Sequence, residues 1–274
     1  YEECSTGNLN YGYINGGYAN YTFSAPAAGC PGAYSFAPNV TNIYRIDYAN
    51  DTNAAVVISY NTNSGGRKGA CGNNNFGYWL GGDAKCSGSS GGSTTYVERT
   101  DYASDTTNSV RKGDLPTSTQ YSRGQGNTNY GYCIGSSSYR SHVFRVDYAN
   151  DTATAVQKGN LSRDYYKFAT TGNAVGGYAV SGAQGGPNVT STDRIDYSND
   201  TATASPKGPL AVGVQEASGV SAFENGLTPS APNFIPRVRF IDLELEGTGA
   251  TPEVPESVAG PAYGYFAGGQ GSPS

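Results

Sequence analysis

Arginine and aspartate recur two residues apart in this sequence, a pattern that could supply a general acid and its electrostatic partner. The pairs are Arg45/Asp47, Arg99/Asp101, Arg145/Asp147 and Arg194/Asp196. A carboxylate beside a guanidinium can take part in proton transfer, but an active site is needed only once in a chain. Because the pair recurs with a longer block, we interpret it as a structural device of the fold.

Other catalytic constellations lack the residues that they require. The chain has one histidine, His142, which excludes any site built on two imidazole ligands. A Ser-His-Asp triad would have to use His142, and no nucleophile-elbow motif accompanies it. The calcium loop Asp-x-Asp-x-Asp-Gly is also missing. We therefore expect no catalytic residue, no metal and no cofactor, and we expect His142 to lie at the surface or in a turn.

The Arg-x-Asp pairs belong to a nine-residue block that ends in Asp-Tyr-(Ala/Ser)-(Asn/Ser)-Asp-Thr. Its copies are residues 44–52, 98–106, 144–152 and 193–201, with a weaker copy at 239–243. Alternation along a strand puts Arg45 and Asp47 on one side, and the Asn-Asp-Thr sequence favours a tight turn. In the weaker copy, Phe240 stands at the arginine position. Each block predicts a strand, a polar turn and a returning strand.

A second block, of the type Tyr-Gly-Tyr followed by glycine, alternates with the first. Its copies are residues 11–17, 76–82, 130–135, 177–182 and 263–269, with a degenerate copy at 220–226. A short apolar run ended by glycine is typical of a buried strand that enters a turn. Gly-Asn pairs at 7–8, 72–73, 126–127 and 172–173 predict hairpin turns before four of these strands.

Each unit therefore holds four short strands and almost no helix signal. The aspartates of successive copies are spaced by 54, 46, 49 and 46 residues, and four-stranded units at this period are typical of a β-propeller. We expect an all-β propeller as a single domain over residues 1–274. Six Gly-Tyr strands favour six blades with the last incomplete, and five Asp-Tyr hairpins leave five possible. The expected units are 1–60, 61–112, 113–158, 159–207, 208–255 and a partial unit at 256–274.

The pattern resembles the kelch repeat family in its Gly-Gly strand, variable loop, Val97–Asp101-type strand, polar turn and last strand. The resemblance spans nearly the whole chain and implies a kelch-like propeller. The tryptophan that kelch repeats usually have after the turn is absent, so we expect tyrosines to pack neighbouring blades together. The Asp-Tyr-(Ala/Ser)-Asn-Asp-Thr variant is also similar to kelch-type repeats in structural proteins of marine bacteriophages, which implies a virion protein such as a tail fibre.

Length variation is confined to one part of the repeat. From the Asp of one unit to the Tyr of the next Gly-Tyr strand the count is 31 residues three times, but from that Tyr to the following Asp it is 34, 23, 15 and 18. Insertions on one face of a repeat array often mark the binding face, and loop aromatics suit stacking on sugars or proteins. Alternatively, these rings fold back as a small core under the loop. The candidate ligand-binding residues are Tyr18, Tyr21, Phe23, Tyr34, Phe36 and Tyr139.

Charge and cysteine usage limit the partners. The 17 Lys and Arg against 22 Asp and Glu give a net charge of −5, and without a basic cluster we expect no nucleic-acid surface. No apolar run reaches the 18 residues that a membrane span needs, so we expect no membrane insertion. Cys30 and Cys86 lie in variable loops of consecutive units and could form a disulfide, with Cys71–Cys86 as the alternative. Cys133 is expected to be a buried free thiol.

Three functional hypotheses follow. The first is a non-catalytic propeller, on a virion or in an extracellular setting, that attaches to a glycan or surface protein through its variable loops. The second is a structural assembly subunit whose incomplete last blade docks on a partner chain, such as another virion or surface-assembly chain. The third is a glycan-active hydrolase or lyase in the central channel, which would need a carboxylate or tyrosine cluster that occurs once, and no spacing selects one.

Overall fold

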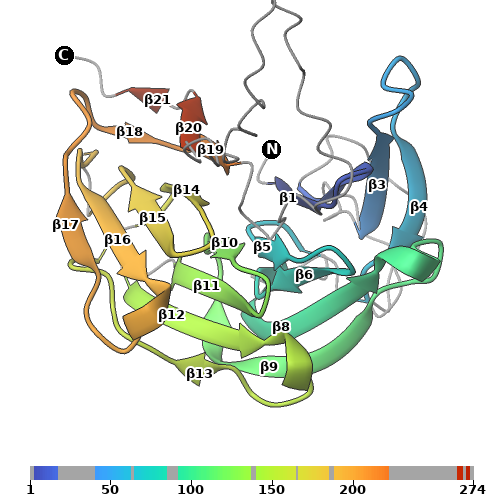
Figure 1. Cartoon of the computed structure of the whole chain (residues 1–274), viewed down its shortest axis with the longest axis horizontal. Helices are drawn as coiled ribbons and strands as arrows, with labels where there is room; N and C mark the ends of the chain where they lie inside the picture. The colour runs from blue at the N-terminus through green and yellow to red at the C-terminus, as the bar shows by residue number, and fades with distance from the viewer. Residues whose placement is uncertain are drawn as a thin grey trace, which may run out of the picture.

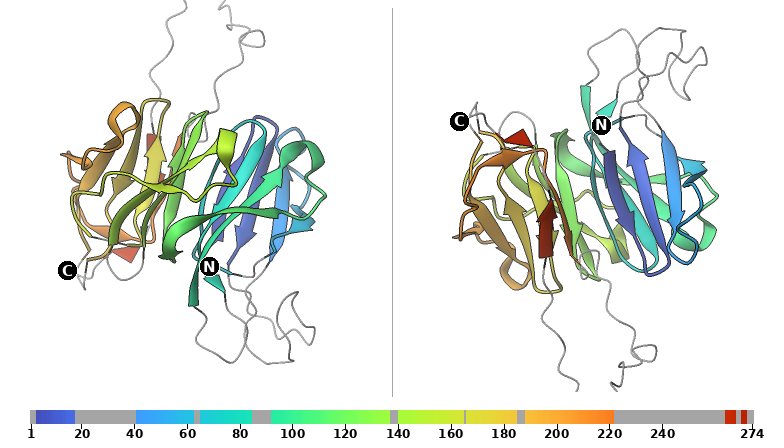
Figure 2. Two further views of the ribbon diagram at one scale, coloured as in Figure 1. Left: turned by 90° about the horizontal axis from the view of Figure 1, so that it is seen from below. Right: turned by 90° about the horizontal axis from the view of Figure 1, so that it is seen from above.

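The computed structural model describes residues 3–17, 41–62, 65–84, 92–136, 140–164, 166–184, 188–221, 264–267 and 270–271. In these residues the regular structure is β-strand, apart from three single-turn 3₁₀ helices. The sheets are arranged around a central axis, and the first strand of each sheet lies nearest that axis (Figure 1). Figure 2 shows the sheets side by side, with their strands running roughly along the axis. The chain is therefore a β-propeller, as the two repeated blocks predict.

Four sheets have antiparallel strands that follow one another in chain order from the axis outward. Sheet 1 contains β1 (Glu3–Gly7), β2 (Tyr11–Gly16), β3 (Asn42–Asp47) and β4 (Val56–Tyr60). Sheet 2 contains β5 (Gly69–Gly72), β6 (Phe76–Leu80), β8 (Gly92–Asp101) and β9 (Val110–Thr119), with β7 (Asp83–Ala84) also paired to β8. Sheet 3 contains β10 (Arg123–Gly126), β11 (Tyr130–Ser136), β12 (Arg140–Asp147) and β13 (Val156–Gln157). Sheet 4 contains β14 (Ala169–Gly172), β15 (Gly176–Val180), β16 (Thr192–Asp196) and β17 (Ser205–Lys207).

Two two-stranded sheets come next and are here together called the fifth sheet. It contains β18 (Val214–Gln215) and β19 (Ser218–Ser221), paired with β21 (Gln270–Gly271) and β20 (Gly264–Ala267) respectively. The last Gly-Tyr copy therefore lies in the second place of this sheet and does not begin a sixth. The expectation that residues 220–226 form a Gly-Tyr strand is wrong at its start, because Val220 belongs to the innermost strand β19. The described residues contain five innermost strands. This number corresponds to the five-bladed alternative and not to the six-bladed one.

Asparagine side chains close the hairpins between the first two strands of each of the first four sheets. The Asn8 Oδ1 accepts hydrogen bonds from the backbone N–H groups of Asn10 and Tyr11, both at 2.9 Å. Asn73, Asn127 and Asn173 accept the equivalent pairs of bonds. Each side chain thus accepts from backbone N–H donors that the tight turn leaves without a backbone acceptor. The hairpin turns predicted from the Gly-Asn pairs are confirmed.

The innermost strands approach one another closely because their residues are small. A methyl group added to Gly124 on β10 would lie 2.0 Å from the backbone oxygen of Ala70 on β5. The Thr170 hydroxyl on β14 donates to the Gly124 carbonyl at 3.0 Å. The main apolar clusters lie between neighbouring sheets, as in the set Tyr78, Leu80, Phe144 and Val146 of sheets 2 and 3.

Neighbouring sheets are joined by a repeated polar contact, here called the inter-sheet clamp. At the first boundary, the carboxylate of Asp105 in sheet 2 accepts hydrogen bonds from the Tyr13 hydroxyl (2.9 Å) and the Arg45 guanidinium (2.8 Å) of sheet 1. The next two clamps join Tyr78 and Arg99 to Asp151, and Tyr132 and Arg145 to Asp200. The three carboxylate side chains are only 9%, 7% and 6% exposed. The arginines of the repeated block therefore act in the frame.

Tyrosine rings complete the same boundaries. Tyr102 stacks on Tyr13 with ring centroids 4.5 Å apart. The pairs Tyr148/Tyr78 and Tyr197/Tyr132 stack in the same way, at 4.7 and 4.8 Å. The expectation that tyrosine packs the blades together in place of tryptophan is confirmed at these three boundaries.

In the three described clamps, the arginine of a block does not bond to the aspartate that follows it by two residues. That aspartate instead caps the turn that follows its strand. The Asp101 carboxylate accepts from the backbone N–H of Ala103 at 3.0 Å, at the start of η1 (Tyr102–Ser104). The same bond begins η2 (Tyr148–Asn150) and η3 (Tyr197–Asn199). The aspartate that follows the arginine thus caps a turn within its own sheet, and the last aspartate of the block accepts the clamp bonds from the preceding sheet.

The clamp hydroxyls make stability sensitive to alkaline pH. Burial, together with the neighbouring aspartate, raises the pKa of Tyr13, Tyr78 and Tyr132 well above the usual value of 10. Above that pH the unfolded chain loses protons that the folded chain retains, so the free energy of unfolding falls as pH rises. We expect urea unfolding, followed by circular dichroism, to give a stability that is constant below about pH 10 and decreases above it. A stability that stays constant to about pH 11 would contradict this.

The cysteine and histidine expectations have mixed outcomes. Cys133 is a buried free thiol, as predicted, and burial raises its pKa to about 11. Cys71 is also free and buried, so the alternative pairing Cys71–Cys86 is wrong, whereas Cys30 and Cys86 lie outside the described residues. His142 does not lie in a turn: it is half-buried within β12, because its ring stacks on Phe144 at 5.3 Å.

Candidate functional site

The variable loops leave one face of the propeller, here called the loop face. Antiparallel pairing places the end of each second strand beside the start of the innermost strand, as in Glu3 opposite Gly16 and Arg123 opposite Ile134. The segments between second and third strands therefore begin and end on the face where the innermost strands begin. The clamps and the Asp-Tyr turns lie at the other end of these strands, since Tyr11 pairs with Asp47.

All of the residues predicted to bind a ligand fall outside the described residues. They are Tyr18, Tyr21, Phe23, Tyr34, Phe36 and Tyr139. What the structure does describe on the loop face is the entrance of the central channel. The site is therefore built here from the residues around that entrance.

Four side chains at the entrance occupy one repeated backbone position, and they are here called the rim. They are Arg67, Tyr121, Lys167 and Glu216, each two residues before its innermost strand, with φ of 63°, 56°, 58° and 57°. Left-handed backbone is uncommon for residues other than glycine, yet each of the four units places a large side chain there. The backbone position is a constant of the fold, whereas the residue type changes from unit to unit.

The rim side chains contact one another across sheet boundaries. The Arg67 guanidinium lies over the Tyr121 ring, 4.3 Å from its centroid, and the Lys167 ammonium lies 5.5 Å from the same centroid. Tyr166 meets Tyr121 edge to face at 5.8 Å. Arg67 is held by the buried Asp83 at 2.8 Å. The result is a half-buried tyrosine between two cations, which can contact the ring of a ligand by stacking and its negative groups by charge.

Lys167 connects the rim to the fifth sheet. Its ammonium forms an ion pair with the exposed carboxylate of Glu216. The charge of the rim thus changes sign at Glu216, so a ligand lying along the rim would meet cationic and then anionic side chains. Opposite charges in sequence along one edge favour a ligand of defined orientation over a general polyanion.

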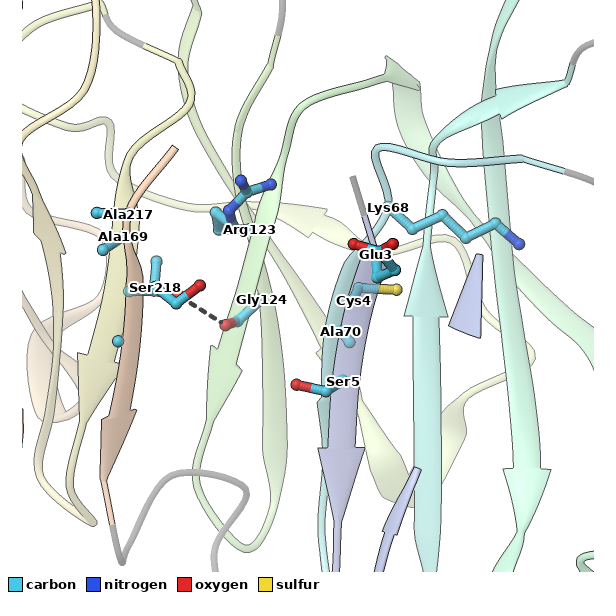
Figure 3. Close-up of a pocket in the computed structure, with 12 residues that line it drawn as sticks. Glu3, Cys4, Ser5, Lys68, Ala70, Arg123, Gly124, Ala169, Ala217 and Ser218 are labelled. Atoms are coloured by element: carbon cyan, nitrogen blue, oxygen red, sulfur yellow. Dashed lines mark hydrogen bonds between the residues drawn. The ribbon is translucent and has the colours of Figure 1, made fainter. Parts of the chain in front are cut away.

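The channel below the rim is narrow. It holds a cavity of about 130 Å³, compared with about 300 Å³ or more for usual small-molecule sites. Figure 3 shows Glu3, Lys68 and Arg123 toward one end of it, with Ser5 and Gly124 further along. Every innermost strand contributes small residues to the lining, which leaves room for water but not for a drug-sized ligand.

Lys68, which lines the channel, is engaged in the frame. Lys68 and Glu98 form an ion pair at 3.0 Å, and each side chain is 1% exposed. The Thr62 hydroxyl donates a further bond to Glu98. Burial raises the pKa of the Cys4 thiol to about 12, so Cys4 is protonated at neutral pH and is a poor nucleophile.

No group of three or more His, Cys, Asp or Glu side chains that could hold a metal ion occurs among the described residues. Nor does this part of the chain contain a helix long and apolar enough to cross a membrane.

The sequence gives no residue-type signal for the rim. Arginine, tyrosine, lysine and glutamate share no property that a search for repeats could follow. The signal that could have located them is positional, two residues before each innermost strand, and it becomes visible only when the strand bounds are fixed. The rim lies on the same face as the segments of variable length, which is the face that the sequence predicts for binding.

Comparison with known proteins supports the fold. No protein-family model matches the sequence, and no curated protein matches it. In all, 171 chains of solved structures match. One of them, titled "Structure of YjhT", has a TM-score of 0.60 and 11% sequence identity, over 80% of this chain and 69% of that chain. At this identity the likeness shows the fold alone, and the chain is an all-β propeller of four-stranded sheets.

Proposed function

We propose that this protein is a non-catalytic attachment propeller of a virion or extracellular surface. It binds a glycan or a surface protein through the loop face, with the rim around the channel entrance as the central part of the contact. Tyr121, flanked by Arg67 and Lys167, provides the aromatic and cationic groups at that centre. The variable loops with Tyr18, Tyr21, Phe23, Tyr34, Phe36 and Tyr139 provide the surrounding part.

The observation that supports the proposal most strongly is the contrast between the two ends of the sheets. Away from the loop face, each clamp uses the same residue types at three boundaries. On the loop face, one backbone position bears four different residue types, and the neighbouring loops differ in length. A structural frame needs the same contact at every boundary, whereas recognition of an asymmetric ligand needs different side chains around the entrance.

Two further observations favour attachment over catalysis. The buried carboxylates Asp105, Asp151 and Asp200 are used in the clamps, and Glu98 is used in an ion pair. The lining of the 130 Å³ cavity includes one carboxylate, Glu3, whereas glycoside hydrolysis uses a pair. The likeness of the Asp-Tyr block to marine phage repeats supports the virion setting by analogy.

A glycan array tests the proposal directly. The purified chain should bind a subset of glycans selectively, and Tyr121→Ala should lower the affinity for them by about tenfold or more, as expected for a central aromatic contact. Replacing the six loop aromatics with alanine should also weaken binding. The matched control is Leu9→Ser, because Leu9 is exposed in a turn at the opposite end of the sheets and should leave the affinity unchanged.

Thermal unfolding of each variant separates loss of binding from loss of fold. Selective binding that survives both Tyr121→Ala and the loop replacements would reject the loop face as the ligand site. A chain that binds no glycan on the array would reject the glycan form of the proposal, and cell-surface protein binding with the same variants would then decide the remaining form.

A further inference from the structure

Each of the five sheets places a charged side chain that reaches solvent at the start of its innermost strand or two residues before it. In order around the axis they are Glu3, Arg67, Arg123, Lys167 and Glu216. The two signs of charge are not interspersed. The three cations come from sheets 2, 3 and 4, and an acidic side chain lies at each end of the series.

The three cations gather around Tyr121. The Arg67 guanidinium and the Lys167 ammonium lie 4.3 and 5.5 Å from the centroid of the same Tyr121 ring. Arg123 follows Tyr121 by two residues and lines the cavity below it, and Figure 3 shows Arg123 and Glu3 toward the same end of that cavity. Like charges held this close repel one another. A negative group of a ligand placed among them would relieve that repulsion.

The carboxylates paired with two of these cations do not prevent them from contacting a ligand. Asp83 is only 1% exposed and holds Arg67 from the protein side, whereas the Arg67 side chain is 19% exposed. The pair of Lys167 and Glu216 lies at the surface, with side chains 21% and 41% exposed. Exposed ion pairs are weak, so an anion of the ligand can compete with Glu216 for the ammonium.

Glu3 and Glu216 limit the rest of the ligand. Both side chains are exposed, and an ionised carboxylate only accepts hydrogen bonds. Each therefore suits a hydroxyl donor and repels a second negative group. A neutral sugar would leave the cations of the rim without a negative group, and a polymer with an acidic group on every unit would bring negative charge against Glu3 or Glu216. A sugar residue with one acidic group and several hydroxyls fits both features.

We propose that the rim binds a single acidic sugar residue. Its carboxylate or sulfate group is bound by Arg67 and Lys167, its ring lies against Tyr121, and a hydroxyl beside the acidic group donates to Glu216. Charge-assisted hydrogen bonds to the acidic group supply the preference, and the acidic side chains at the ends of the series fix its orientation. This assignment rests on the proposed attachment function and adds the chemical class of the ligand.

Matched sets of glycans on an array test the assignment. Each set holds a neutral oligosaccharide, the same oligosaccharide with one terminal uronic acid, and the same oligosaccharide with one sulfate ester. The chain should bind an acidic member at least about tenfold more tightly than its neutral counterpart. Raising NaCl from about 0.05 to about 0.5 M should reduce this preference, because salt screens charge. Comparison of the uronic acid and sulfate members identifies the acidic group.

Substitutions at the rim connect the preference to named side chains. Lys167→Gln should lower the affinity for the acidic members by about tenfold more than the affinity for the neutral members. Lys167→Arg keeps the charge and should retain the preference. Arg67→Gln should act like Lys167→Gln, with its melting temperature measured first because the buried Asp83 loses a partner. The matched control is Lys207→Gln, since Lys207 is exposed on β17, the outermost strand of sheet 4.

The outcomes separate this assignment from the attachment proposal. Equal affinity for neutral and acidic members, or a preference that Lys167→Gln leaves intact, would overturn the acidic-sugar assignment. If the bound glycans nevertheless depend on Tyr121, attachment through the loop face would stand. A chain that binds no member of any set would overturn both the assignment and the glycan form of the attachment proposal.

Discussion

Replacing Asp151 with alanine is expected to lower the free energy of unfolding by about 3 kcal/mol. The substitution removes the acceptor of the second clamp, and it leaves the Arg99 guanidinium and the Tyr78 hydroxyl without a partner in a largely buried boundary. Lys112, which lies 3.5 Å from the same carboxylate, loses its partner as well. A desolvated charge without its counter-charge is the costly part, because the pair itself offsets its desolvation only when both members are present.

The matched control for this experiment is Asp51→Ala. Asp51 stands at the same position of the repeated block, but it is exposed and has no clamp partner in the described residues. Its removal should change the free energy of unfolding by less than about 0.5 kcal/mol. Thermal unfolding should show Asp151→Ala melting roughly 6–12 °C below the wild type. Equal effects of the two substitutions would show that the clamp does not hold the sheets together.

Replacing Gly124 with alanine is expected to destabilise the propeller by a similar amount, about 3 kcal/mol. The added methyl carbon would lie 2.0 Å from the Ala70 carbonyl oxygen and 2.4 Å from its carbonyl carbon. These are backbone atoms of β5, so no side-chain rotation can relieve the overlap. The innermost strands β5 and β10 would have to separate, and the Thr170 hydroxyl bond to the Gly124 carbonyl would be strained.

Gly208→Ala serves as the control for the glycine experiment, because an added methyl group there meets no atom within 4 Å. It should leave the melting temperature unchanged or raise it slightly, since alanine restricts the unfolded chain more than glycine does. Differential scanning calorimetry of the two variants measures the difference. A melting temperature of Gly124→Ala equal to that of Gly208→Ala would mean that the innermost strands can move apart at little cost.

The order of strands and the all-β architecture could be predicted from the sequence because they depend on local signals that repeat. Gly-Asn pairs fix four hairpin turns, and the Asp-Tyr blocks end four strands at a shared place. Such contacts join residues only a few positions apart, so their residue types can be read along the chain. The same reasoning placed the variable loops on one face and identified tyrosine as the residue that packs the blades.

Only the tertiary structure decided which residues meet across sheet boundaries. The partner of Arg45 is Asp105, sixty residues away in sequence, and not its near neighbour Asp47. The rim became visible only when the left-handed positions of Arg67, Tyr121 and Lys167 were placed around one channel. Repetition in sequence specifies each unit, but the rotation between successive units determines which side chains of different units come into contact.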